Sequence, residues 1–412
     1  MPVLRLLLLL LLLLLPVPAS GSWDSASSSS RWDPSSLHLF VDLAGLASVE
    51  NVTLVQHRPR IDGQVIVAPD RPWDGGGGDG YIHPYVGTVQ VSATELRIYY
   101  FGEGAGVRCL CVAVSRDAGL TWAKPSLGLV AINGSKDNNI VAAGSPLGFL
   151  GSADIAAGTV FIDRNPDVLP HELYKMVMHW KNGAAMFASA DGFSFRNMTA
   201  EPALVGSDTQ DVVFWDTRLS AYVYYGRSHM RGGQSETCSE SLPGMPPAPE
   251  PERSINHFVI GADVTEWPYS HADDNQTQIV CLNTDESDPP CVDIYTSSAT
   301  PVGDATLFFP MMYNHFDSVY AQGRGNDGTL EARLAVSRPG GRASFVSREA
   351  FYPRGEGRPR VGNTGVYEGS FDAAATAIAQ GLFQVKDETW LVGMGRQYTH
   401  AGCKSPPFTD RI

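Results

Sequence analysis

The chain has 412 residues, 43% of them hydrophobic, and a formal net charge of −14 at pH 7. This charge argues against nucleic acid and anionic membrane surfaces as partners, because both repel an acidic protein. The length and the hydrophobic content suffice for one large domain with its own core.

The first 22 residues have the pattern of a secretory signal peptide. Arg5 is followed by ten leucines at 6–15 and then by proline and small residues that suit cleavage near Gly21. The leucine run is shorter than the roughly 20 residues of a membrane-spanning helix, and no later segment is long and apolar enough to span. We therefore expect a secreted or secretory-lumen protein, with a retained signal anchor as the alternative.

Residues 23–36 are rich in serine and are predicted to form a spacer, and residues 37–412 are predicted to form a single domain. Four N-glycosylation sequons agree with a secretory route. They begin at Asn51, Asn133, Asn197 and Asn275.

Six cysteines in a chain with a signal peptide favour disulfide bonds. Cys281 and Cys291 flank a short loop and are the best candidate pair. Cys109 and Cys111 share one face of a strand, so we expect them to bond to other cysteines, such as Cys238 or Cys403. A Cys-x-Cys metal site is the alternative, but no second pair of ligands stands at a suitable spacing. We expect no metal and no cofactor.

The sequence SRDAGLTW at 115–122 recurs in three weaker copies. The aromatic residues that close the four copies are spaced by 73, 72 and 78 residues. Each copy follows a run of alternating apolar residues, which indicates a strand with one buried face. The shared aspartate and glycine suit a tight turn, because aspartate bonds to nearby backbone amides and glycine accepts a positive φ. The pattern predicts a repeated four-stranded unit.

The predicted strands follow these turns in chain order. Those of the first three units are 87–91, 96–102, 108–114, 158–162, 173–180, 184–190, 211–215, 221–227 and 255–260. Those of the fourth unit are 305–313, 318–324 and 330–336, and a fifth pair is 381–385 and 389–395. Strands at 39–42 and 51–57 supply the missing half of the fifth unit. The sequence therefore predicts an all-β, five-bladed β-propeller whose ring is closed by N-terminal strands.

Acidic residues precede nearly every predicted innermost strand, where loops surround the mouth of a propeller's central channel. A single such residue usually caps a turn. A recurring set indicates a site, because converging carboxylates repel one another unless they bind something. The acids are Asp79, Asp154, Asp208, Asp211, Asp293, Glu368 and Asp372.

Cleavage of a glycosidic bond is the chemistry that requires such a set, with one carboxylic acid and one carboxylate beside the scissile bond. Crowding among carboxylates raises the pKa of one of them, which supplies the acid. We expect the catalytic residues to be Asp154, Asp208, Asp293 and Asp372. We expect the substrate-binding residues to be Asp79, His83, Trp73, Tyr295 and Glu368. Tyr81, Trp215 and Tyr313 are further candidates for stacking on a sugar, although packing inside a blade is the simpler interpretation of Trp215.

Several segments resemble proteins of the glycoside hydrolase family 32 N-terminal-like group, which is related to the five-bladed propellers of families 32 and 43. They include LFVD, LVQHRPR, PDRPWDG, WAKPSLGLVAINGSKDNNIV, DTQDVVFWD and CVDIYTSSATP. The resemblance runs from about Leu39 to His400 and implies a propeller that acts on carbohydrates. The turn SRDAGLTW also resembles the Asp-box of sialidases, but no sialidase-like arginine triad is recognisable.

The chain departs from the catalytic motifs of family 32. The Trp-x-Asn-Asp-Pro, Arg-Asp-Pro and Glu-Cys motifs are not intact, and the C-terminal β-sandwich of many relatives is absent. The resemblance therefore implies the fold more firmly than the activity. We expect a secreted glycoside hydrolase that cleaves an oligo- or polysaccharide. The alternative is a non-catalytic carbohydrate- or protein-binding propeller, and a sialidase-type enzyme agrees less well with the sequence.

Overall fold

The computed structural model describes residues 3–6, 39, 41–43, 46, 48–61, 63–76, 80–144, 155–207, 209–230, 252–272, 280–289, 291–316, 327–339, 341–360, 365–400 and 402. The fold is all-β, with 49% strand and 2% helix, which confirms the all-β part of the predicted fold class. The helical residues form two 3₁₀ turns, Pro72–Asp74 (η1) and Pro170–Glu172 (η2). Within the described ranges, no helix is both long enough and apolar enough to cross a membrane.

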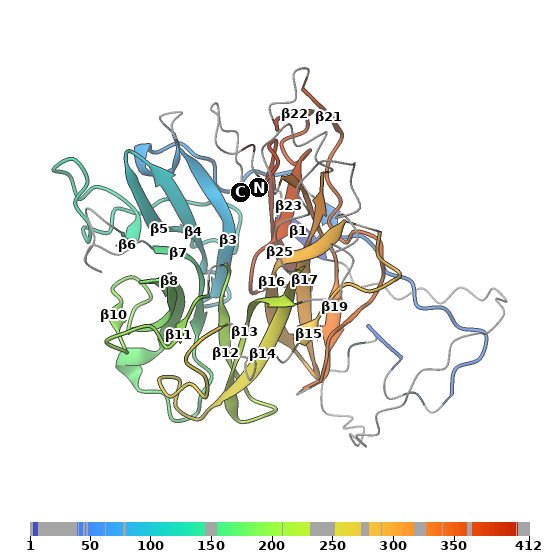
Figure 1. Cartoon of the computed structure of the whole chain (residues 1–412). Coiled ribbons are helices and arrows are strands. Elements are labelled where there is room, and N and C mark those ends of the chain that lie inside the picture. The colour runs from blue at the N-terminus through green and yellow to red at the C-terminus, as the bar shows by residue number, and fades with distance from the viewer. Residues whose placement is uncertain are drawn as a thin grey trace, which may run out of the picture.

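The first three units are antiparallel sheets, each built from consecutive strands (Figure 1). The first contains β3 (Tyr81–Gln90), β4 (Leu96–Gly104), β5 (Val107–Ser115) and β6 (Ile140–Ala143). The second contains β7 (Ile155–Ile162), β8 (Tyr174–Trp180), β9 (Gly183–Ser189), β10 (Arg196–Asn197) and β11 (Leu204–Val205). The third contains β12 (Val212–Asp216), β13 (Ala221–Met230), β14 (Glu252–Gly261) and β15 (Val280–Leu282). Each strand predicted for these units lies wholly or largely in one of these strands.

The fourth and fifth units join in one larger sheet through a parallel contact between Leu330 and Ala375. The fourth contains β16 (Val292–Val302), β17 (Ala305–His315), β18 (Gly328–Ala332), β19 (Ala335–Ser337) and β20 (Ser344–Phe345). The fifth contains β23 (Ala375–Ile378), β24 (Phe383–Val385), β25 (Glu388–Arg396), β1 (Val3–Leu6) and β2 (Arg60–Ile61). A separate ribbon pairs β21 (Gly357–Pro359) with β22 (Tyr367–Gly369).

The fourth unit corrects our prediction of its strand order. Its first strand is β16, so the segment 305–313 is the second strand rather than the first. The predicted strand 318–324 lies outside the described residues. The fifth unit likewise begins earlier than predicted, at β23.

The predicted N-terminal strands are also wrong, because no strand includes residues 39, 41, 42 or 51–57. In the structure β1 pairs with β25, and β2 pairs with β1. Contacts of Leu39 and Asp42 instead hold this segment against the fourth unit. The backbone N–H of Leu39 donates to Asp304 Oδ1 at 3.2 Å, and Arg338 Nη2 lies 2.6 Å from Asp42 Oδ1.

The repeated turn has the hydrogen bonds that its sequence predicts. In the first copy, Ser115 Oγ accepts from the backbone N–H of Gly119 at 2.8 Å, and Asp117 Oδ1 accepts from that of Thr121 at 2.9 Å. In the second copy, Ser189 and Asp191 accept from backbone amides of the same turn. The motif therefore sets the turn after the third strand and does not itself form a site.

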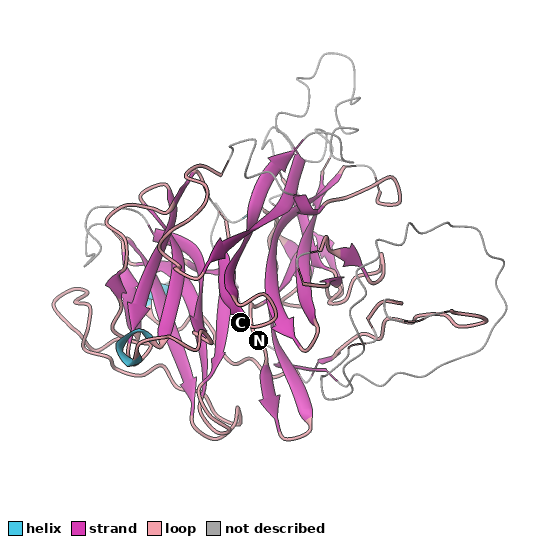
Figure 2. Ribbon diagram, turned by 90° about the horizontal axis from the view of Figure 1, so that it is seen from below, coloured by secondary structure: helices cyan, strands magenta, loops and turns pink. Residues whose placement is uncertain are grey.

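The units meet through their first strands and the residues beside these strands. Thr159 Oγ1 of β7 donates to the carbonyl of Asp211 before β12, and the backbone N–H of Thr88 in β3 donates to the carbonyl of Gln380 at 2.8 Å. Gln380 Nε2 in turn donates to the carbonyl of Ala299 in β16 at 3.5 Å. Figure 2 shows the sheets from a second direction, with strands far outnumbering helices. Apolar clusters fill the spaces between adjacent sheets and form the core.

The cysteines also differ from our prediction. Cys281 is a buried free thiol and Cys291 is disulfide-bonded, so the predicted Cys281–Cys291 bond is wrong. The reason is local, because β15 directs Cys281 into the apolar core of the third unit. Cys109 and Cys111 are also free and lie side by side, with their sulfur atoms 3.5 Å apart.

Candidate functional site

The candidate site lies where the first strands begin, and we call this side of the fold the leading end. β3 runs in the same direction as the backbone at Gln380, as their parallel bridge at Gly87 shows. β16 brings its first residues to the same place, because Tyr85 OH donates to Tyr295 OH at 3.2 Å. Residues of the first and fourth units therefore meet at the leading end.

Tyr295 is the centre of an aromatic group. Its ring makes edge contacts with Tyr313 and His400, with centroid distances of 5.6 and 5.0 Å. The ring of His315 lies 3.9 Å from that of Tyr313. Burial raises the pKa of the Tyr313 phenol far above its ordinary value, and therefore the phenol stays neutral. Neutral tyrosine hydroxyls and ring edges are groups that bind sugar hydroxyls and sugar faces.

Two arginines of the third unit approach Tyr295 from β13 and β14. The guanidinium carbons of Arg227 and Arg253 lie 5.6 and 6.0 Å from the centre of its ring. Asp293 is buried beside them, and its Oδ2 accepts from both the backbone and the side chain of Arg253 at 3.3 Å. His315 Nε2 lies 3.2 Å from Asp293 Oδ1. The Arg253–Asp293 pair thus links the third unit to the fourth.

We name these eight residues the Tyr295 cluster. It comprises Tyr85, Arg227, Arg253, Asp293, Tyr295, Tyr313, His315 and His400.

His83 lies on β3, two residues before Tyr85, and forms a pair with Glu103 of β4. Its Nε2 is 3.2 Å from Glu103 Oε2, and Arg108 also donates to that oxygen. The hydrogen bond from His83 lowers the pKa of Glu103 to about 2, and burial lowers the pKa of His83. The neutral imidazole therefore donates from Nε2 and keeps Nδ1 as an acceptor. The ring of Tyr81 is tilted by 40° relative to that of His83, and their centroids are 4.5 Å apart.

The two acids predicted at the fifth unit have other partners. Asp372 accepts from Ser370 Oγ at 2.7 Å and from Tyr352 OH at 3.1 Å. Glu368 lies on β22 and is 3.5 Å from the exposed Arg358. Asp372 thus binds hydroxyl groups of its own surroundings, and Glu368 stands on the separate ribbon of β21 and β22.

Two further candidates pack within their own units. Trp73 lies in η1, where its indole N–H donates to Asn139 Oδ1 at 2.9 Å. Trp215 is buried and packs edge-on against Tyr222, in agreement with the packing interpretation.

Asp211 accepts from Tyr224 OH at 2.7 Å and from Ser207 Oγ. Asp79, Asp154 and Asp208 lie outside the described residues.

Sequence reasoning missed Arg227, Arg253 and Glu103. All three stand near the ends of second or third strands, whereas the site was predicted only from residues before first strands. Each is a charged residue at the end of a largely apolar segment, which marks the residue itself but not the neighbours that it meets in the fold.

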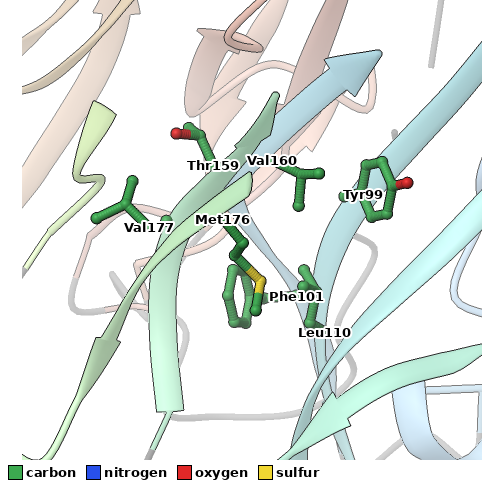
Figure 3. Close-up of a pocket in the computed structure, with 8 residues that line it drawn as sticks. Tyr99, Phe101, Leu110, Thr159, Val160, Met176 and Val177 are labelled. Carbon is green, nitrogen blue, oxygen red and sulfur yellow. The ribbon is translucent and has the colours of Figure 1, made fainter. Parts of the chain in front are cut away.

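A gap between the first two sheets is not a second candidate site (Figure 3). Its lining is mainly apolar and includes Phe101, Leu110 and Met176, and it has no room for a water molecule. It is a gap in packing. Among the described residues, no three histidine, cysteine or acidic side chains are grouped to hold a metal ion.

No protein-family model matches the chain, and no curated protein matches it. Similar solved structures include one described as a glycoside hydrolase, at 9% identity and a TM-score of 0.49, covering 84% of this chain and 89% of that one. A putative glycoside hydrolase from Bacteroides ovatus has 12% identity and a TM-score of 0.49, covering 87% and 96%. The catalytic domain of the Coprinopsis cinerea GH62 alpha-L-arabinofuranosidase has 11% identity and a TM-score of 0.43, covering 85% and 95%. These scores are all below 0.5, so any functional proposal has to rest on the site itself.

Proposed function

We propose that this protein is a secreted, five-bladed β-propeller of the glycoside hydrolase type whose carbohydrate site is the leading end. The observation that carries the proposal is the Tyr295 cluster. There, aromatic rings, hydroxyls and charged groups from different units converge around one half-buried tyrosine. Aromatic faces combined with a few directed polar groups are the usual composition of a sugar-binding site.

The propeller proposal is supported by the contacts between first strands. The first unit contacts the fifth through Thr88 and Gln380, and the fifth contacts the fourth through Gln380 and Ala299. The fourth contacts the third through Thr296 and residues before β12. These three contacts are those expected between the first, fifth, fourth and third blades of a ring, and they support the propeller proposal.

The proposed catalytic roles depend on how each acid is bonded. Asp293 already accepts from Arg253, so we assign it to holding the site together and orienting the substrate. Asp208 then takes the role of proton donor, and Asp154 that of base or transition-state stabiliser. Asp372 and Glu368 remain proposed members, and Asp79 and Trp73 remain proposed contacts for the substrate.

His83 is assigned to substrate binding through Nδ1. Because Glu103 fixes the proton on Nε2, Nδ1 is oriented to accept a hydrogen bond from a sugar hydroxyl. Tyr81 and Tyr85 occupy the same face of β3 and flank His83. A sugar ring stacked along this face would contact all three side chains.

Secretion is proposed from the leucine run and the sequons. Asn51, Asn133 and Asn197 are all exposed, as a glycosylated asparagine must be. The disulfide bond of Cys291 agrees with an oxidising compartment. Enzymatic removal of N-glycans from the purified protein should increase its mobility on a gel.

The second candidate function is binding without hydrolysis. It is favoured by the engagement of the described acids, since Asp293 is ion-paired and Asp372 accepts two hydroxyl hydrogen bonds. Acids that are engaged in this way are less available for proton transfer.

A hydrolysis screen tests the proposal. The secreted protein is incubated with neutral and acidic oligo- and polysaccharides, and the release of reducing ends is measured. We expect at least one substrate to be cleaved, and Asp208→Asn to lower kcat by about 10²- to 10⁴-fold. Asp137 lies in an exposed loop, so Asp137→Asn serves as the matched control and should retain activity. Binding of a glycan without any turnover would select the second function.

A further inference from the structure

We propose that His83 is a catalytic residue of the proposed hydrolase: its Nδ1 takes the proton of the attacking water, and Glu103 positions the imidazole. This inference rests on the proposed function and deepens it, because it names the base of the reaction. Asp154 then has the other role left open for it, that of transition-state stabiliser.

His83 stands in an irregular part of β3. The pairing of β3 with β4 shifts register between Ile82 and Val86, where β3 advances by four residues while β4 advances by two. Pro84 falls inside this stretch and has no backbone N–H to donate to the ladder. A bulge re-aims side chains that a regular strand would direct elsewhere, and bulges are common beside active sites. The direction of His83 is therefore set by the bulge rather than by the alternation of the strand.

The ring of His83 has two tyrosines of its own strand as neighbours. Its centroid is 4.5 Å from that of Tyr81 and 6.2 Å from that of Tyr85. The hydroxyl of Tyr85 in turn donates to Tyr295, so His83 stands beside the Tyr295 cluster. The side chain of His83 is 13% exposed. It is thus largely shielded from bulk water while remaining open to a small ligand.

His83 and Glu103 are bonded as a base and its orienting carboxylate are. Nε2 of His83 lies 3.2 Å from Glu103 Oε2, which also accepts from Arg108 Nε at 2.9 Å. The carboxylate keeps the proton of the neutral imidazole on Nε2, and it stabilises the imidazolium that forms when Nδ1 gains a second proton. Within the described part of the chain, Nδ1 of His83 has no hydrogen-bond partner. This nitrogen is therefore available to a water molecule.

The protonation states suit this role at neutral pH. Burial lowers the pKa of His83 from its ordinary 6.5, and the nearby Arg108 and Arg396 act in the same direction, while Glu103 opposes them. The imidazole is therefore neutral and able to accept a proton. Glu103 is ionised, since its pKa is lowered to about 2.

The described acids that we predicted to be catalytic are less suited to the step. Asp293 accepts from the guanidinium of Arg253, and Asp372 accepts from two hydroxyl groups. A carboxylate that already accepts such bonds is a weaker base than a neutral imidazole with an open nitrogen.

The proposed step balances as a single displacement. The oxygen of the water bound at Nδ1 forms a bond to the anomeric carbon, and one of its protons moves to His83. The bond between the anomeric carbon and the leaving oxygen breaks, and Asp208 gives its proton to that oxygen. His83 then releases one proton to solvent and Asp208 regains one, which restores both groups. A single displacement inverts the configuration of the anomeric carbon.

Variants of His83 separate proton transfer from binding. The substrates are 4-nitrophenyl glycosides and every oligosaccharide that is cleaved in the hydrolysis screen. His83→Gln keeps an amide that can bond to a hydroxyl but cannot take a proton, so kcat should fall about 10²- to 10⁴-fold with little change in KM. Added imidazole should restore part of the activity of His83→Ala. His171→Gln, at an exposed histidine 3.8 Å from Glu172, is the matched control and should retain kcat.

The pH profile and the product give two further readouts. Activity of the wild type should be lost as the pH falls through the pKa of His83, below 6.5. Glu103→Gln removes the carboxylate that favours the imidazolium, so it should lower kcat and move this acid limb of kcat/KM to lower pH. Proton NMR of the first product released by the wild type should show the anomer opposite to that of the substrate.

The outcomes distinguish the inference from the function on which it rests. An unchanged kcat in His83→Gln, an unmoved acid limb in Glu103→Gln, or a product of retained configuration would overturn the role of His83 and leave the hydrolase function standing. Absence of turnover with every substrate would overturn both. Urea midpoints show whether each variant is folded, and the product anomer is read on the wild type, which needs no variant.

Discussion

Removing the side chain of Arg253 is expected to destabilise the whole domain. Its guanidinium and Asp293 are 5% and 2% exposed, so the pair is shielded from water on both sides. Arg253→Met leaves the Asp293 carboxylate buried, with the backbone N–H of residue 253 and the imidazole of His315 as its neighbours. Loss of one member of a buried pair typically costs about 3–5 kcal/mol. Because the side-chain hydrogen bond is long, at 3.3 Å, and the backbone hydrogen bond is kept, we expect a loss of about 3 kcal/mol, at the lower end of this range.

A double-mutant cycle separates the pair from its surroundings. Urea unfolding is measured for the wild type, Arg253→Met, Asp293→Asn and the double variant. The double variant should be more stable than the sum of the single effects implies, because it leaves no unpaired charge. Arg358→Ala is the matched control, since its partner Glu368 is exposed and the loss should be below about 1 kcal/mol. If Arg253→Met lowers the free energy of unfolding by no more than the Arg358→Ala control does, the claim that the Arg253–Asp293 pair is buried and joins two units is wrong.

Three further expectations concern other parts of the chain. The pKa of Glu103 is lowered to about 2, so this carboxylate contributes stability that is present above its ordinary pKa of 4.5 and lost as the pH falls towards 2. Glu103→Gln should therefore lower the free energy of unfolding at neutral pH, flatten the acid side of the stability profile, and differ little from the wild type near pH 2. Gly119→Ala should reduce the free energy of unfolding more than Gly128→Ala. Both glycines have positive φ, which costs about 1–2 kcal/mol for alanine. Only at Gly119 would the added methyl group lie close to a neighbour, the Trp390 indole at 2.6 Å. Burial raises the pKa of Cys281 to about 12, so this thiol should react with iodoacetamide only after unfolding. Rapid alkylation of Cys281 in the native protein, detected by mass spectrometry, would show that β15 is not buried.

The sequence predicted the first three units well because their strands are apolar runs bounded by turn residues, and the third strand of each unit is followed by the repeated turn. β16 was missed as the first strand of the fourth unit because it contains a run of serine and threonine and a proline. The structure buries Thr296, Ser297 and Ser298 where neighbouring sheets meet, so their polarity reflects contacts between units rather than exposure. β23 was missed because its short alanine-rich sequence carries little periodic signal.

The candidate site was predicted in part for a similar reason. His83, Asp293 and Tyr295 stand in or near first strands, where the repeat pattern predicted the site, and the structure places them at the leading end. Arg227 and Arg253 lie on β13 and β14, in the part of this strand pair that extends past the end of β12. The pairing of β13 with β14 brings both arginines to Tyr295. Such convergence depends on register and on packing between sheets, which no local pattern in the sequence reveals.

The central claim is that the leading end is the carbohydrate site, and hydrogen–deuterium exchange with and without the tightest-binding glycan tests it most directly. We predict that added protection will be concentrated in peptides that contain Tyr81–Gln90 of β3 and the first residues of β16, around Asp293 and Tyr295. Peptides from the outer strands β10 and β20 should exchange at unchanged rates. Protection confined to those outer strands, with no change around Tyr295, would contradict the account.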